Sequence, residues 1–77
     1  MRTVTLYTRA GCCLCDEARD VLDRVRAWRP FVLDVVDIEG NDALHRRYLE
    51  RIPVVAVDGV ERFEFEVDER ALAAALE

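Results

Sequence analysis

The sequence has no lysine, serine or glutamine, and only three glycines and two prolines in 77 residues. It therefore has no linker or low-complexity segment of the kind that glycine, proline and serine form. Apolar residues make up 52% and charged residues 35% of the chain, which is typical of a folded globular protein and not of a disordered one. All eleven basic residues are arginine, a bias from which we infer no function.

Length and charge exclude several classes of protein. At 77 residues the chain is too short for a dinucleotide-binding domain or a barrel enzyme, and we expect a single domain over residues 1–77. A net charge of −5 argues against binding nucleic acid or an anionic membrane through bulk charge. No apolar run approaches the ~20 residues of a membrane span, and the first residues show no apolar signal-peptide region. We therefore expect a cytoplasmic monomer with neither nucleic-acid nor membrane partners.

The three cysteines, in contrast, are concentrated in one short segment, at Cys12, Cys13 and Cys15. A structural disulfide restricts the unfolded chain by joining distant segments, so these cysteines cannot hold the fold together. Either they do chemistry, or they bind a metal, or they are incidental. An odd number of thiols in a reducing compartment fits a reactive site better than a structural bridge.

Hydrophobic periodicity predicts seven elements. They are strands at 2–8, 31–38, 54–57 and 60–67, helices at 13–29 and 42–51, and a final helix capped by Asp68. The first helix shows one apolar face, formed by Leu14, Ala18, Val21, Leu22, Val25 and Trp28. Pro30 ends this helix, and Asn41 is a good N-cap for the next.

The last two strands are predicted to form a hairpin. Asp58-Gly59 favours a type I′ turn, which needs positive φ at both central residues. In the strand that follows, Phe63, Phe65 and Val67 alternate with charged residues, so we expect these three to face the core.

The predicted order is β-α-β-α-β-β-α. The first strand-helix-strand unit requires parallel strands, and the hairpin requires an antiparallel pair. The economical arrangement is an α/β fold with a four-stranded mixed sheet and helices on both faces. This arrangement resembles a minimal thioredoxin fold.

A Cys-x-x-Cys pair that follows a strand and opens a helix has a specific chemical use. Cys12 stands at the predicted helix start, where unpaired backbone N–H groups and the positive end of the helix dipole favour a thiolate. The thiolate is the attacking form in disulfide exchange, and Cys15 is one helical turn away. We therefore predict that Cys12 is the catalytic nucleophile and Cys15 the resolving thiol of a redox-active disulfide. Cys13 is expected to be exposed and dispensable.

Two segments carry a resemblance to a known family. Tyr7-Thr8-Arg9-Ala10-Gly11-Cys12-Cys13-Leu14-Cys15, followed by Asp16-Glu17-Ala18, is similar to the active-site pattern of glutaredoxins, in particular of the short glutaredoxin-like proteins of bacteria. Arg51-Ile52-Pro53-Val54-Val55 resembles the segment that carries the family's cis-proline. The resemblance implies a cis bond before Pro53 and a substrate-binding backbone at Ile52. A trans proline that merely begins a strand is the alternative.

The sequence also departs from the glutaredoxin pattern. Cys13 stands where glutaredoxins usually have proline, and Leu14 stands where many have an aromatic residue. The Gly-Gly pair after the last strand is absent, and the chain there reads Glu66-Val67-Asp68. In the family this region helps to hold the γ-glutamyl end of glutathione. Asp68 either takes part of that role or only caps the last helix.

Two functional hypotheses follow from these residues. The first is a glutaredoxin-like thiol-disulfide oxidoreductase, an electron-transfer enzyme that reduces protein or glutathione mixed disulfides without a bound cofactor or metal. Glutathione or a reductase would supply its electrons, and Arg9 either holds a substrate carboxylate or is an ordinary surface arginine. The second is a thioredoxin-fold binding module that holds a metal or iron–sulfur cluster, or docks a partner, with little turnover. Apart from the three cysteines, His45 is the only Cys or His residue, so a four-ligand zinc site within one chain is unfavourable.

Overall fold

The computed structural model describes all 77 residues. Its elements follow the predicted order, with a short 3₁₀ turn added. They are β1 (Thr3–Thr8), α1 (Cys13–Trp28), β2 (Val32–Asp37), the 3₁₀ turn η1 (Ile38–Gly40), α2 (Asp42–Tyr48), β3 (Val54–Val57), β4 (Val60–Glu64) and α3 (Glu69–Ala75). No helix is long and apolar enough to cross a membrane.

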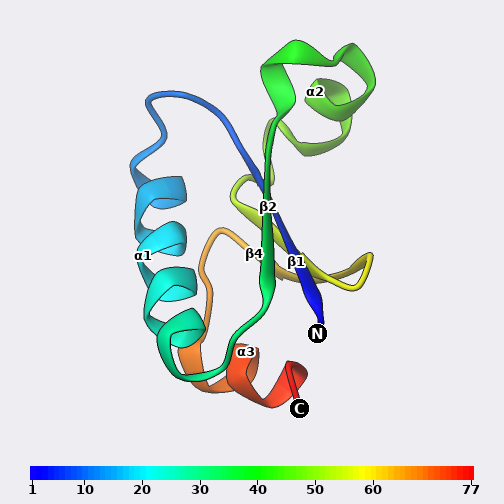
Figure 1. Cartoon of the computed structure of the whole chain (residues 1–77). Coiled ribbons are helices and arrows are strands. Elements are labelled where there is room, and N and C mark those ends of the chain that lie inside the picture. Colours follow the sequence, from blue (N-terminus) through cyan, green and yellow to red (C-terminus); the bar gives the residue numbers. More distant parts are fainter.

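The four strands form one mixed sheet in the order β2-β1-β3-β4. β1 pairs with β2 in parallel and with β3 antiparallel, and β3 pairs with β4 antiparallel. α1 and α3 lie side by side against one face, and α2 lies at the end of the sheet where β1 runs into α1 (Figure 1). The Tyr48 ring of α2 stacks on Tyr7, on the face opposite α1 and α3, so helices lie on both faces in the thioredoxin-like arrangement that the element order predicted.

The main core lies between the sheet and the helix pair α1 and α3. Because side chains alternate along a strand, Val4 and Leu6 of β1 both face α1, and both are buried. Leu22, Val25 and Leu72 fill the space from the helix side, and none of them is exposed to solvent.

Local capping and turn signals were confirmed at each place where they were predicted. The Asn41 side chain caps α2 by accepting from the Leu44 N–H. Asp58 and Gly59 both have positive φ, as a type I′ turn requires. These features form within a few residues, so the surrounding fold does not have to create them.

Three apolar side chains that were expected in the core are exposed instead. Trp28 is 57% exposed because it lies in the last turn of α1, where the Arg29 guanidinium lies over its ring. Leu14 is 42% exposed because it faces the segment after β4 across a cavity.

Phe65 is the third, at 46% exposed. β4 ends at Glu64 and not at Val67, and Phe65 takes a φ of 65°, which breaks the alternation that would have turned its ring inward.

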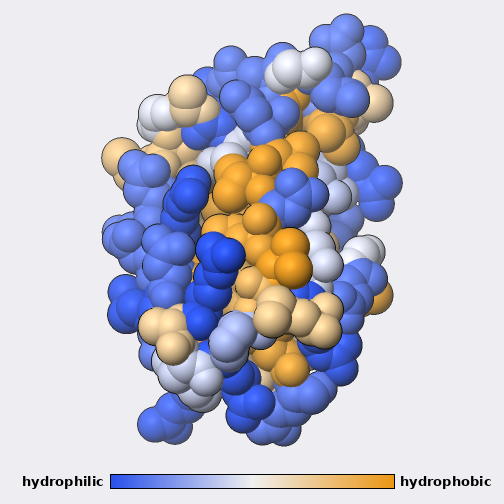
Figure 2. All heavy atoms as spheres, viewed as in Figure 1, coloured by the Kyte–Doolittle hydropathy of each residue, from blue (hydrophilic) through white to orange (hydrophobic).

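The free edge of the sheet at β2 is partly apolar. Val32 and Val35 of this edge strand are both exposed. Figure 2 shows an apolar strip down this side of the molecule, over β2 and between hydrophilic surfaces.

Candidate active site

Cys12 is the N-cap residue of α1. Its backbone is extended, with φ −92° and ψ 110°, while its carbonyl already accepts the first helical hydrogen bond, from the Asp16 N–H. Its Sγ accepts from the Cys15 N–H at 3.3 Å. The sulfur thus occupies the place of a capping oxygen, at the end of the helix where unpaired N–H groups and the dipole favour negative charge. The structure thus places Cys12 at the helix start, as predicted, and its role as the nucleophile stays a prediction.

Cys15 lies beneath Cys12 and is only 3% exposed. Burial is the largest cause that raises the pKa of the Cys15 thiol above its ordinary value, because it removes a thiolate from water. A hydrogen bond with the Cys12 side chain raises this pKa further. Cys15 is therefore held as a thiol next to the Cys12 sulfur.

Two groups before the motif act in the opposite direction on Cys15. The Thr8 side chain and the Arg9 backbone both form hydrogen bonds that lower the pKa of Cys15. The sequence reasoning missed Thr8 as a site residue. Its position at the end of β1, four residues before Cys12, is a signal that could have indicated it, because the carboxyl end of this strand leads into the motif.

All three cysteines are free in the structure, and their exposure differs. Cys12 is half-buried, Cys13 is exposed and Cys15 is buried. The exposure of Cys13 was expected, because adjacent residues of a helix do not share a face.

The Ile52–Pro53 bond is cis, which confirms that prediction. Ile52 and Cys15 belong to one buried cluster, against which Cys12 packs. The Ile52 N–H donates to the Tyr48 carbonyl at 3.0 Å, and the Pro53 carbonyl accepts from the Phe65 N–H at 2.9 Å. The fold therefore joins the dithiol to two segments that are distant from it in sequence.

Tyr48 supports this cluster from α2. Its ring stacks on Tyr7 with centroids 4.4 Å apart, and its hydroxyl donates to Glu61 Oε2 at 3.0 Å. Burial, and then the hydrogen bond to Glu61, raise the pKa of Tyr48 to about 12. Arg51, in the segment after α2, forms ion pairs with Glu61 and Glu64 beside this ring, and these pairs fix that segment to β4.

Arg9 and Asp68, the other predicted binding residues, already have partners. Arg9 forms an exposed ion pair with Glu39, with Nε and Oε1 3.1 Å apart. Asp68 caps α3 by accepting from the Ala71 N–H at 3.0 Å. The capping role considered for Asp68 is thus present, and a role of either residue toward substrate stays a prediction.

No three Cys, His, Asp or Glu side chains lie together in a way that could hold a metal ion. The only cysteines are the three of the motif, and they differ in burial. The geometry of a single chain therefore gives no support to the metal-binding alternative.

Fold and dithiol together define a small thioredoxin-fold protein of the glutaredoxin-like class. Residues 3–77 match the family described as Glutaredoxin-like domain (DUF836), and the chain belongs to this family. An uncharacterized protein of Mycobacterium tuberculosis is 36% identical over 76 residues, which span 92% of this chain and 78% of the relative.

Solved structures support the same assignment. A solution structure of a Nitrosomonas europaea protein is 32% identical, with a TM-score of 0.86 over 99% of this chain and 92% of that one. A crystal structure from X. campestris is 33% identical, with a TM-score of 0.79 over 95% and 93% of the two chains. A thioredoxin mutant from Halobacterium salinarum, 21% identical with a TM-score of 0.70, covers 97% of this chain and 71% of its own length, and shares the fold.

Proposed function

We propose that this protein is a thiol-disulfide oxidoreductase in which Cys12 attacks and Cys15 resolves. The observation that carries the proposal is the asymmetry of the pair. Cys12 is half-exposed at the helix N-terminus and accepts the Cys15 N–H, whereas Cys15 is buried and its thiol pKa is raised. A substrate sulfur can reach Cys12 but not Cys15.

In the first step the Cys12 thiolate attacks one sulfur of a substrate disulfide. A bond forms between Cys12 Sγ and that sulfur, the substrate S–S bond breaks, and the second substrate sulfur leaves as a thiolate. That thiolate takes a proton from water. The helix N-terminus favours the attacking thiolate before the reaction.

In the second step Cys15 attacks Cys12 Sγ. Once Cys12 is in a mixed disulfide it carries no negative charge, so its hydrogen bond and its charge no longer raise the pKa of Cys15. The hydrogen bonds from Thr8 and Arg9 remain and favour the Cys15 thiolate. Its proton passes to water, a Cys12–Cys15 bond forms, and the remaining substrate thiolate is released. The substrate gains two electrons, and the dithiol loses them.

Regeneration needs an external reductant of the thiol class, and no bound cofactor. Glutathione and a dithiol reductase are the two candidate donors, and protein disulfides or mixed disulfides are the candidate substrates. Reduction of the oxidised protein by glutathione, compared with reduction by a thioredoxin reductase, distinguishes the donors.

Three cysteine variants test the mechanism. Cys12→Ser is expected to abolish reduction of a peptide disulfide, and Cys15→Ser to accumulate a mixed disulfide that intact mass detects. Cys13→Ala is the matched control, since it removes a thiol of the same segment that has no assigned step. Full activity of Cys12→Ser, or no adduct on Cys15→Ser under oxidising conditions, would contradict the assigned roles.

A further inference from the structure

A cavity of about 210 Å³ lies between α1 and the segment that follows β4. Five of its seven lining residues are apolar. The lining consists of Leu14, Glu17, Ala18, Val21, Phe65, Glu66 and Val67. A dry cavity of ~150 Å³ in another protein holds a benzene molecule, so this one has room for a large apolar side chain.

The backbone conformation of Phe65 places its ring at the opening of the cavity. A φ of 65° is uncommon for any residue other than glycine, and here it leaves the aromatic ring 46% exposed beside the cavity. The Phe65 N–H donates to the Pro53 carbonyl, which fixes this turn against the cis-proline segment. Ordinary strand geometry would have buried the ring instead.

One wall of the cavity belongs to the dithiol segment, although no cysteine lines it. Leu14, which is 42% exposed, is the residue between Cys13 and Cys15, and Phe65 is tied to the residue after Ile52. A chain segment whose cysteine is bonded to Cys12 therefore has its neighbouring side chains within reach of this cavity.

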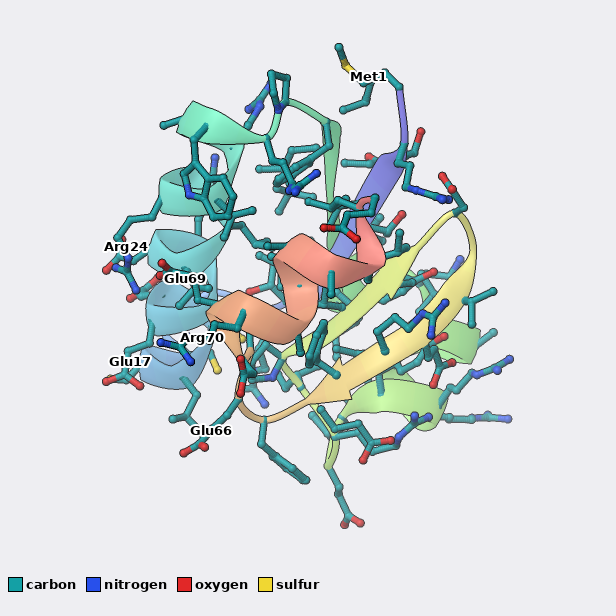
Figure 3. All side chains as sticks on the ribbon, turned by 90° about the horizontal axis from the view of Figure 1, so that it is seen from below. Met1, Glu17, Arg24, Glu66, Glu69 and Arg70 are labelled. Carbon is teal, nitrogen blue, oxygen red and sulfur yellow. The ribbon has the colours of Figure 1, made fainter.

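Two carboxylates border the apolar surface. Neither Glu17 nor Glu66 forms an ion pair in the structure. In Figure 3 the Arg70 side chain of α3 extends toward Glu17, whereas the Glu66 side chain projects away from both of them. On the side of Glu66, which forms no ion pair, the mouth thus favours a cation next to the apolar group and repels a carboxylate such as those of glutathione.

We propose that this cleft, lined by Leu14 and Phe65 and bordered by Glu66, binds a protein substrate. The occupant is a segment of a disulfide-bearing protein with a large apolar side chain followed by lysine or arginine, next to its reacting cysteine. This inference rests on the proposed function and adds the substrate class to it. Protein disulfides of this kind are then reduced in preference to glutathione disulfide.

The test compares short cyclic peptides with one internal disulfide under single-turnover conditions. The reduced protein is mixed with each peptide, quenched with acid, and the peptide thiols are measured by chromatography. Peptides with Leu-Arg, Ala-Arg or Leu-Glu beside the cysteine, and glutathione disulfide, are the four substrates. We expect Leu-Arg to react about tenfold faster than Ala-Arg, since one apolar group in a fitted pocket contributes roughly 10–200-fold. Leu-Glu and glutathione disulfide are expected to be slower than Leu-Arg.

Two variants connect these preferences to the cleft. Phe65→Gly removes the ring while glycine adopts positive φ without strain, so we expect the fold to persist and the Leu-over-Ala preference to disappear. Glu66→Gln should remove the Arg-over-Glu preference and leave the Leu-over-Ala preference. Trp28→Ala and Glu50→Gln, an exposed ring and an exposed carboxylate far from the cleft in sequence, are the matched controls.

A second measurement separates failure of this proposal from failure of the proposed function. The same peptides with serine in place of cysteine are titrated into the protein, and amide shifts are followed by NMR at Leu14 and Phe65. Equal rates of reduction for all four substrates, or amide shifts at neither residue, would refute the proposal that this cleft binds the substrate. If the Leu-Arg peptide binds at these residues but no disulfide is reduced, the binding cleft is supported and the proposed oxidoreductase function is refuted.

Discussion

Thr8 offers the sharpest test of how Cys15 acts. Its side-chain hydroxyl lowers the pKa of Cys15 and can be removed by substitution, whereas the other group that lowers this pKa by a hydrogen bond is the backbone of Arg9. Thr8→Val keeps the shape and the β-branched side chain and removes the hydroxyl. Attack by Cys12 should proceed as before, and the resolving step should be slower near neutral pH.

The size of the effect follows from the hydrogen bond that is lost. A hydrogen bond to a charged group contributes ~1.5 kcal/mol at the low end, which is about tenfold in the population of the Cys15 thiolate. A thiol of higher pKa is intrinsically more nucleophilic, with a Brønsted coefficient of ~0.4–0.5, and this restores about threefold. The net expectation is resolution about threefold slower below the pKa of Cys15.

The assay follows two successive releases of a coloured aromatic thiol. In a Cys13→Ala background the reduced protein is mixed with an aromatic disulfide, so that the first release reports attack by Cys12 and the second reports attack by Cys15. Thr5→Val, on the same strand, is the matched control, since Thr5 forms no hydrogen bond with either cysteine.

The pH dependence of the resolving step shows whether Thr8 acts by stabilising the Cys15 thiolate or only by packing against it. Above the pKa of Cys15 in both proteins each holds a full thiolate, so the variant should lose its deficit and become about threefold faster, by the same Brønsted coefficient. Unchanged resolution in Thr8→Val near neutral pH, or an equal slowing at every pH, would refute the reasoning.

Three further predictions follow from the structure. Cys13→Ala should keep most of the turnover and remove disulfide-linked dimers that form in air, as non-reducing electrophoresis would show. The folded protein raises the pKa of Tyr48 from 10.0 to about 12, so the contribution of Tyr48 to stability is present below pH 10.0 and is lost as pH rises toward about 12. Urea unfolding at pH 9 and at pH 11 should therefore show that Tyr48→Phe loses less free energy of unfolding between these two pH values than the unaltered protein does. Leu22→Ala should lower the free energy of unfolding by ~2–5 kcal/mol because this side chain is fully buried, whereas exposed Trp28→Ala should change it by roughly 0.5 kcal/mol or less.

Each of these has a result that would contradict it. Loss of turnover in Cys13→Ala would give that thiol a step in the cycle. An equal alkaline loss in Tyr48→Phe would show that the phenol does not titrate with unfolding. If Leu22→Ala left the free energy of unfolding unchanged, the core around α1 would have to collapse into the space that the side chain vacates.

The sequence by itself determined the features that form between near neighbours. Cys12 caps α1, Asn41 caps α2, and Asp58-Gly59 turns the chain, because capping and turn geometry depend on residues within a few positions. The dithiol spacing belongs to the same group, since one helical turn joins Cys12 and Cys15 without help from the rest of the chain.

Only the tertiary structure decided how the dithiol is surrounded. Burial of Cys15 and its cluster with Tyr48 and Ile52 depend on strands and helices that are far apart in the sequence. Phe65 is the clearest case. Its alternation with charged residues indicated a buried ring, yet β4 ends at Glu64, three residues before the predicted end, and the positive φ of Phe65 turns the ring outward. Periodicity specifies which face a side chain takes while a strand lasts, but pairing with other strands decides where the strand ends.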